Sequence, residues 1–118
     1  MGLIVLLIAL GGGAGAVSRF GVMQLSSRFV THMPIGVLIC NLLGSLLIGV
    51  VAAFLIKSSM FSEEMSIYVR TFFVTGFLGG FTTFSSFSLE ALSLLQKGEL
   101  MTAMLYVLIS VLASLLMV

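Results

Sequence analysis

Residues 79–88 combine residue types that are unusual inside an apolar sequence. They read Gly-Gly-Phe-Thr-Thr-Phe-Ser-Ser-Phe-Ser, and apolar residues flank them on both sides. Paired glycines and consecutive hydroxyl residues are poor helix formers. In hydrocarbon, irregular backbone survives only where it is buried in protein or lines a polar path. The run therefore predicts a break near residues 79–83 in a membrane helix, and an ion at that break.

The side chains around this break favour binding of a small anion. Phe84 and Phe87 are three residues apart, so on a helix after the break their rings project from the same side. A ring edge carries the positive end of the aromatic quadrupole. Asn41 lies in another apolar segment and offers two N–H donors. Such a lining suits a small, strongly hydrated anion, whereas backbone carbonyls freed between Gly79 and Thr82 suit a cation.

Two further stripes of polar residues recur at helical spacing. Asn41 and Ser45 are four apart, and Tyr106, Ser110 and Ser114 are also spaced by four. Each stripe therefore lies on one helix face. Taken singly, small and hydroxyl-bearing stripes in membrane helices are more often packing sites than ion paths. Their convergence with the aromatic pair is what favours a path.

Three ionisable residues near these segments leave alternatives open. Arg19 lies well inside the first apolar segment, where it is either a cation that extends to the membrane surface or an electropositive entrance for an anion. Glu90 is either a proton site or an exposed residue near a helix end. His32 beside Pro34 is interpreted as a solvated turn residue without a role.

Composition identifies the class of protein that must position these residues. The chain has 118 residues, of which 60% are hydrophobic and 8% charged. Its mean hydropathy is +1.32. Because one crossing takes about 20 residues, the chain has room for about four. We expect an all-α membrane protein, a single four-helix transmembrane domain over 1–118, with both termini on one side. The expected spans are 3–25, 35–56, 69–95 with the break inside it, and 100–118.

Several classes of function are excluded by what the sequence lacks. It has no Ser-His-Asp set, no Cys/His metal spacing, no phosphate-binding loop and no paired acids, so it does not resemble an enzyme. A net charge of +1 without a basic patch argues against nucleic-acid binding. The first apolar run lacks a preceding positive region, so we interpret it as a mature helix rather than a secretion signal. Transport and assembly remain.

Orientation is poorly specified by the charges. Lys57 and Arg70 fall on the side of the termini, while Arg28, Lys97 and the nearby Arg19 fall on the other. The bias that normally keeps Lys and Arg in the cytoplasm nearly cancels. Insertion in both directions, and hence an antiparallel dimer of identical subunits, is permitted. A fixed orientation set by a partner or by Arg19 is the alternative.

Three motifs together resemble the signature of the Fluc (CrcB) fluoride channels. They are Gly12-x-x-Gly15-Ala16-x-x-Arg19, Gly36-x-x-x-x-Asn41-x-x-Gly44-Ser45, and Gly76-Phe77-x-Gly79-Gly80-Phe81-Thr82-Thr83-Phe84-Ser85-Ser86-Phe87-Ser88-x-Glu90. The resemblance implies a multi-pass protein of the bacterial inner membrane that forms an antiparallel, dual-topology homodimer. It further implies passive export of toxic fluoride through two pores, and a structural sodium ion at the dimer centre.

The resemblance also assigns roles to individual residues. Backbone carbonyls of Gly79 and Thr82 would hold sodium, and Arg19 would be the basic residue near the vestibule. The residues that would line the fluoride pore are Phe84, Phe87, Asn41, Ser85, Tyr106, Ser110 and Ser114. The chain departs from the family at Val37, where Thr is frequent, and at Ser86, where Thr is usual.

Two rival functions share some of these features. Small multidrug transporters also have about four spans and little charge bias, but they bind organic cations through a Glu in the first helix, and the first span here has none. The second rival is a non-conducting subunit of a heterodimeric channel. The balanced charges and the intact Phe84 and Phe87 pair argue against it.

Overall fold

The computed structural model describes residues 1–57 and 59–118, and its regular elements there are all helical. In chain order they are α1 (Gly2–Ser27), α2 (Ile35–Lys57), α3 (Glu63–Arg70), η1 (Thr71–Leu78), α4 (Gly79–Phe81), α5 (Phe84–Gln96) and α6 (Leu100–Met117). η1 is a π-helix, in which each turn is wider than in an α-helix.

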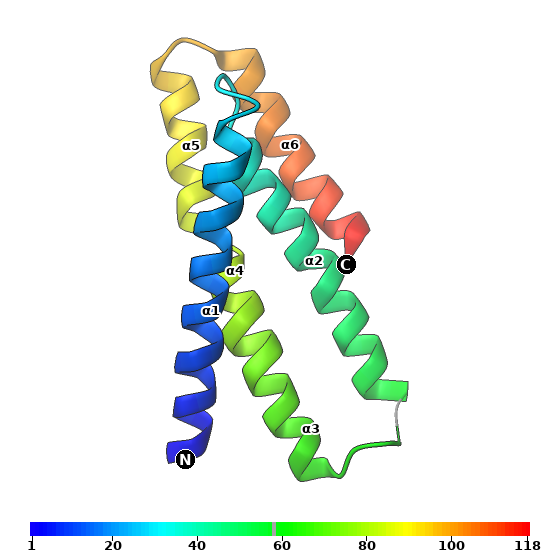
Figure 1. Cartoon of the computed structure of the whole chain (residues 1–118). Coiled ribbons are helices and arrows are strands. Elements are labelled where there is room, and N and C mark those ends of the chain that lie inside the picture. Colours follow the sequence, from blue (N-terminus) through cyan, green and yellow to red (C-terminus); the bar gives the residue numbers. More distant parts are fainter. Residues whose placement is uncertain (58) are drawn as a thin grey trace.

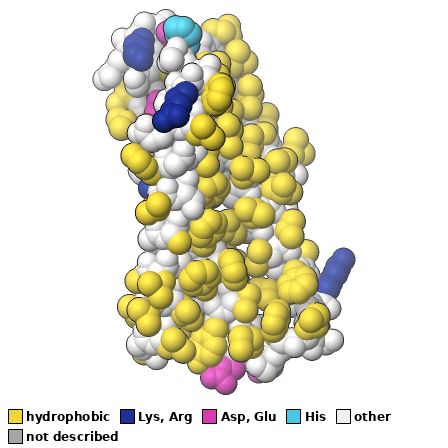
Figure 2. Space-filling model, in the orientation of Figure 1, with side chains coloured by type: hydrophobic (Ala, Val, Ile, Leu, Met, Phe, Trp, Pro, Cys, Tyr) yellow, Lys and Arg dark blue, Asp and Glu magenta, His cyan; other side chains and the backbone are white. Residues whose placement is uncertain are grey.

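Four stretches of the described chain are long and apolar enough to cross a membrane. They are Gly2–Ser27, Ile35–Lys57, Glu63–Gln96 and Leu100–Met117. The molecule is 53 Å long, which exceeds the roughly 40–45 Å of a bilayer with its headgroups. Hydrophobic side chains cover the face seen in Figure 2, and charged side chains gather mainly at the two ends. The expected multi-pass membrane protein with four apolar helices is confirmed.

The spans alternate in direction (Figure 1). α1 runs from the N-terminus to the upper end of the molecule, α2 returns, α3 to α5 ascend again, and α6 descends. α1 packs along η1 and α4, whereas α6 packs against α2 and α5. The upper half of the molecule is therefore formed by α2, α5 and α6 with the end of α1.

Local sequence sets the helix ends on both sides of the third stretch. Ser62 caps α3, because its Oγ accepts a hydrogen bond from the N–H of Met65 at 3.2 Å. At the other end, Gly98 has φ +77° and follows α5. Its N–H donates to the Leu95 carbonyl, and the Glu99 N–H donates to Leu94, the paired bonds that terminate helices at a glycine.

The paired glycines do not interrupt the third stretch, in contrast to the sequence-based expectation. Gly79 and Gly80 are helical, and the extended residues are Thr82 (φ −85°, ψ 157°) and Thr83 (φ −156°, ψ 122°). Gly80 serves packing instead, because a Cβ there would collide with the Gly12 carbonyl of α1. The glycine allows two helix backbones to touch.

α1 and the third stretch cross at a backbone contact built from glycines on both sides. Gly11 faces the backbone of Phe72 and Gly76, and Gly15 faces the Phe77 carbonyl. Contacts toward α1 thus recur every four to five residues along η1, matching the wide π-helical turn. The π-helix keeps this contact face turned toward α1 as far as Thr82 and Thr83, which we call the threonine pair.

We expect Gly15→Ala to destabilise this crossing by about 1–3 kcal/mol, since the added methyl meets backbone that cannot rotate away. Thermal unfolding of the purified protein in detergent measures the effect. Gly21→Ala on the same helix is the control, because a Cβ there meets nothing within 4 Å. Equal unfolding midpoints for the two variants would contradict the assigned contact.

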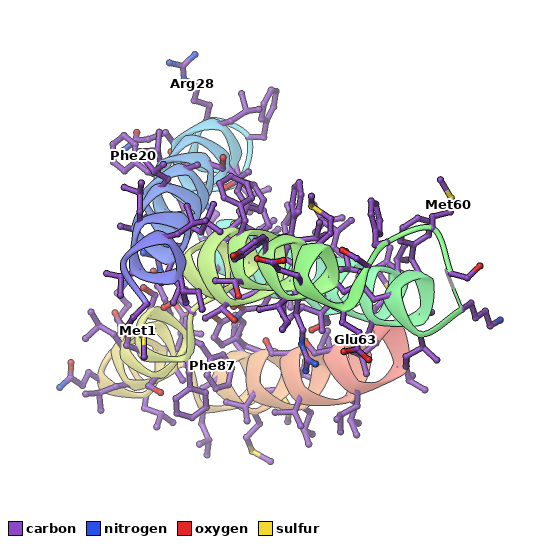
Figure 3. The ribbon with its side chains drawn as sticks, turned by 90° about the horizontal axis from the view of Figure 1, so that it is seen from below. Met1, Phe20, Arg28, Met60, Glu63 and Phe87 are labelled. Carbon is purple, nitrogen blue, oxygen red and sulfur yellow. The ribbon has the colours of Figure 1, made fainter. Side chains whose placement is uncertain are left out.

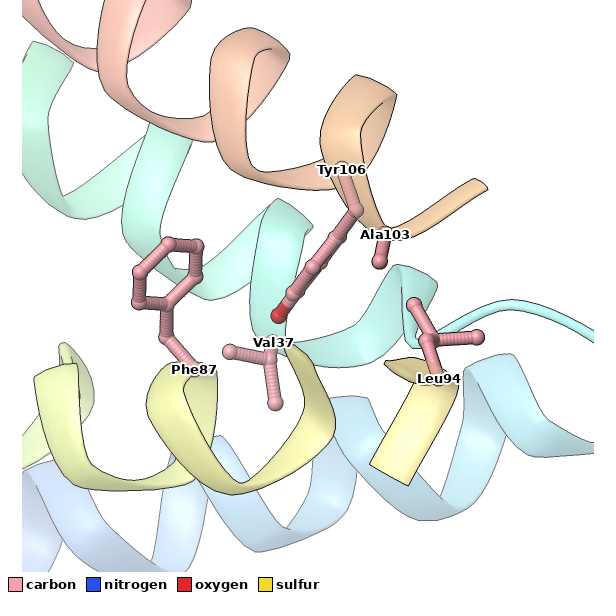
Figure 4. Packing of buried hydrophobic residues seen from close by; sticks show 5 residues of the cluster. All are labelled: Val37, Phe87, Leu94, Ala103 and Tyr106. Carbon is pink, nitrogen blue, oxygen red and sulfur yellow. The ribbon is translucent and has the colours of Figure 1, made fainter. Parts of the chain in front are cut away.

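A hydrophobic cluster fixes α5 and α6 relative to α2. Figure 4 shows Phe87 and Leu94 from α5, Ala103 and Tyr106 from α6, and Val37 from α2 converging. Val37 and Tyr106 are almost completely buried. Phe87 and Tyr106 of this cluster are themselves among the residues predicted for the anion path. The cluster therefore fixes the positions of α5 and α6, which carry most of those residues.

Candidate functional site

A cavity of about 450 Å³ opens between α2, the threonine pair, α5 and α6. Its polar or aromatic lining residues are Asn41, Ser45, Thr82, Thr83, Phe84, Phe87, Ser110 and Ser114. Its other lining residues are Ile48, Val111, Leu115 and Val118. None of the side chains that line it is charged, so the polar or aromatic groups that face its contents, beside the aliphatic side chains, are hydroxyls, one carboxamide and the phenylalanine rings.

Most residues predicted for an anion path meet at this cavity, and some do not. Asn41, Phe84, Phe87, Ser110 and Ser114 line it, and so does Thr82, which was predicted for the cation. The predicted residues outside its lining are Tyr106, Ser85, Gly79 and Arg19. The predicted roles of all these residues in conduction or sodium binding, inside and outside the lining, stay predictions.

The two phenylalanines differ sharply in burial. Their ring centroids are 5.6 Å apart at 42°, so they form one aromatic unit. Phe87 is only 9% exposed and lies between α5 and α6 (Figure 3), where its ring packs at 5.3 Å from that of Tyr106. Phe84 is 78% exposed at the cavity mouth. Burial thus fixes one ring and leaves the other open to whatever occupies the cavity.

Two hydroxyl groups on α6 are buried without a partner in the described part of the chain. They are the Tyr106 OH and the Ser110 Oγ, one helical turn apart. Ser110 is 5% exposed, yet it lines the cavity. A buried hydroxyl without a hydrogen bond costs roughly 1–3 kcal/mol. The arrangement therefore provides a donor that a ligand in the cavity can satisfy.

Hydrogen bonds to η1, α2 and α5 hold the threonine pair in place. Thr82 N–H and Oγ1 both donate to the Leu78 carbonyl at 2.9 Å. Thr83 N–H donates to Asn41 Oδ1 at 2.8 Å, and Asn41 Nδ2 donates back to the Thr83 carbonyl at 3.0 Å. Thr83 Oγ1 accepts from the N–H of Ser86 at 3.1 Å and is 3.2 Å from Ser85 Oγ. Thr83 is thus the N-cap of α5.

A helix C-terminus and a helix N-terminus, which carry opposite partial charges, meet at Thr82 and Thr83. The helical segment that ends at Phe81 presents carbonyls, and the N–H groups of Phe84 and Ser85 at the start of α5 have no acceptor within the helix. In a continuous helix the Gly79 carbonyl would accept from Thr83, but the Thr83 N–H is taken by Asn41. Helix C-termini attract cations and N-termini attract anions. The extended Thr82–Thr83 segment therefore lies between one helix end that attracts cations and one that attracts anions.

The sequence matches a known family along nearly its entire length. The model of the family described as "CrcB-like protein, Camphor Resistance (CrcB)" matches residues 6–118. The chain belongs to the CrcB family. The match includes all of the residues that line the cavity.

Relatives within the CrcB family carry one functional name. A protein of Francisella philomiragia named "Fluoride-specific ion channel FluC" is 56% identical over 118 residues, covering 100% of this chain and 91% of the relative. A Francisella tularensis subsp. mediasiatica protein of that name is 55% identical with the same coverage. A third, from Azobacteroides pseudotrichonymphae, is 42% identical over 92% of this chain and 85% of the relative. The family is one of ion channels and not of enzymes.

Sequence reasoning missed two contributors to this CrcB site. Thr83 is 8% exposed and bonds both to α2 and to the first turn of α5. A Thr three residues before Ser86 is a recognisable N-cap signal, so it was detectable. Gly44 lies beneath the Thr82 methyl group, where a Cβ would collide with it. No pattern within α2 indicates that contact.

Proposed function

We propose that this protein is a passive, fluoride-selective channel that exports toxic fluoride from bacteria across the inner membrane. The single observation that carries the proposal is the uncharged cavity, which gathers hydroxyls, an amide and two aromatic rings at the N-terminus of α5. The name shared by the relatives supports the choice of fluoride. Proteoliposomes that contain this protein alone should release trapped fluoride, and the absence of release would refute the proposal.

Fluoride fits this lining for chemical reasons. A small, hard anion must exchange a strong hydration shell for several donors at once. Ser110 and Ser114 supply hydroxyl hydrogens, the ring edges of Phe84 and Phe87 supply positive partial charge, and the first amides of α5 add a positive helix end. An organic-cation transporter of that class needs a Glu side chain, and no Asp or Glu side chain lines the cavity. The lining therefore favours the anion channel over its multidrug rival.

The proposed working unit is an antiparallel homodimer with two pores. The ring of Phe84 is 78% exposed beside the cavity, so another protein surface can cover it there. A second copy inserted in the opposite direction provides such a surface, and the weak charge bias permits that insertion. In this arrangement the threonine pair lies at mid-membrane depth, Tyr106 and Ser85 belong to the pore, and Arg19 lies at the vestibule.

A structural sodium ion fits the residues at the interruption. Its proposed ligands are the backbone carbonyls of Gly79 and Thr82, and the Gly79 carbonyl has lost its helical partner to the Asn41 bond. Neutral oxygens at a helix C-terminus suit a hard monovalent cation. Among the described residues no group of three His, Cys, Asp or Glu side chains lies together, so the carbonyls are the fitting donors. Two protomers together would supply four such carbonyls.

Removal of sodium should lower both stability and conduction. Exchange of all Na⁺ for N-methyl-D-glucamine leaves the carbonyls without a counter-charge, so we expect the thermal unfolding midpoint to fall and fluoride efflux to slow about tenfold. Restoring Na⁺ should restore both quantities. Identical midpoints and rates in the two media would exclude the sodium site and leave the anion path untouched.

Ser110→Ala should separate function from stability. The change removes an unpartnered buried hydroxyl, so the unfolding midpoint should stay constant or rise. Loss of a donor in the path should slow fluoride efflux by about tenfold. Ser93→Ala, at the far end of α5 from this cavity, is the control. A lower midpoint with normal efflux would assign Ser110 to packing.

A non-conducting subunit of a heterodimer is the remaining rival. It predicts that this protein alone gives dimers without fluoride release. Efflux from liposomes containing only this chain distinguishes the two proposals.

A further inference from the structure

Asn41 uses both atoms of its carboxamide on one backbone residue of another helix. Oδ1 accepts from the Thr83 N–H at 2.8 Å, and Nδ2 donates to the Thr83 carbonyl at 3.0 Å. The orientation of the amide is unambiguous, because a backbone N–H only donates and a carbonyl only accepts. Among the bonds to described residues, one hydrogen of Nδ2 remains for an anionic occupant of the cavity, besides the second lone pair of Oδ1.

The next turn of the same helix face contacts the preceding threonine. Gly44 lies three residues after Asn41, and a Cβ at Gly44 would collide with the Thr82 methyl group. Residues three apart share a helix face. The Asn41 amide therefore binds Thr83, while Gly44 leaves room for the Thr82 methyl group. Asn41 and Gly44 thus contact two consecutive residues of the extended Thr82–Thr83 segment.

We infer that Asn41 and Gly44 form a docking site on α2 that holds the Thr82–Thr83 segment in its extended shape, and that Asn41 is chiefly a positioning residue. Its effect reaches both ends of the interruption. By engaging the Thr83 N–H it keeps the Gly79 carbonyl free, and by fixing Thr83 it fixes the N-cap of α5 and hence the start of the helix that carries Phe84. The docking itself is independent of the channel activity, whereas its consequence for conduction rests on the proposed function.

Amide hydrogen exchange of the purified protein in detergent tests the docking without any measurement of fluoride. In the wild type, the Thr83 amide should be strongly protected although it lies outside a helix, while the amide of Phe84 at the open end of α5 should exchange faster. An unprotected Thr83 amide overturns the inference, whatever the variants do.

Asn41→Ala should raise the exchange rate at Thr83 by about tenfold or more, since its buried N–H loses its acceptor. The rate at Ser86 should rise as well, because its N–H donates to Thr83 Oγ1, which is then no longer held in place. Ser45→Ala, one turn along the same helix and lining the same cavity, should leave these rates unchanged. Amides of α6 report global unfolding. A rise confined to residues 82–88 supports docking, and unchanged rates at Thr83 overturn it.

Gly44→Ala tests the second half of the docking site independently. It should produce the same local rise by displacing Thr82, whereas Gly13→Ala should not, because a Cβ at Gly13 meets nothing within 4 Å. If Asn41→Ala abolishes fluoride efflux with normal Thr83 protection, Asn41 is an anion ligand and not a positioning residue. If wild-type protein shows the protection but no efflux, the docking stands and the proposed function fails.

Discussion

Replacing Phe84 by isoleucine should slow fluoride efflux by about a hundredfold, equivalent to about 2.7 kcal/mol of added barrier. Isoleucine keeps an apolar side chain but has no ring edge, so an anion that has lost its water finds no positive partial charge there. Phe84 is 78% exposed, so its replacement removes little packing from the protomer. Efflux measured with a fluoride electrode on reconstituted vesicles gives the rate, and size-exclusion chromatography checks that the variant keeps the assembly state of the wild type.

The matched control is Phe20→Ile. Phe20 is 62% exposed and points away from the bundle on α1 (Figure 3), so its replacement should leave efflux at the wild-type rate. Phe87→Ile should also slow conduction, but it disturbs the contact with Tyr106 as well and is the less specific variant. Wild-type efflux from both Phe84→Ile and Phe87→Ile would reduce the rings to packing elements.

The four apolar helices were predictable because each signal is local. Apolar runs of the required length, the cap at Ser62 and the glycine at Gly98 all act within a few residues. The helicity of Gly79 and Gly80 was not predictable in this way. The helix propensity of both is poor, but Gly80 lies directly against the backbone of α1, and which helix passes beside it is a property of the whole fold.

The residues at the cavity were predictable from their types and spacing, whereas their bonds were not. Ser110 and Ser114 follow the helical period, so their common face could be read from the sequence. The same reasoning assigned two free donors to Asn41, but one donor and the acceptor bind Thr83. Those atoms are 42 residues apart in the chain, and only tertiary packing brings them together.

The π-helical conformation of η1 likewise could not be predicted from the residues of that segment. Its residues Thr71–Leu78 are predominantly apolar and read as ordinary helix. Phe72, Gly76 and Phe77 of this segment lie against the backbone of α1, a spacing that agrees with the wider turn. The residues of η1 taken alone do not signal that turn.

The difference between fluoride and chloride efflux is the largest effect that we expect. Chloride is larger and less strongly solvated, so closely spaced hydroxyls and ring edges that replace the shell of fluoride do not fit it equally well. Both anions carry the same charge, so the comparison isolates the lining from the membrane potential. Vesicles from one preparation, loaded with equal concentrations of either salt, provide the matched pair.

The decisive measurement is anion release from vesicles that contain only this protein, with potassium permeability supplied by an ionophore. The account predicts fluoride release at least about a thousandfold faster than chloride release, a difference of about 4 kcal/mol. Fluoride retention in vesicles that contain folded protein, or release of both anions at one rate, would contradict it.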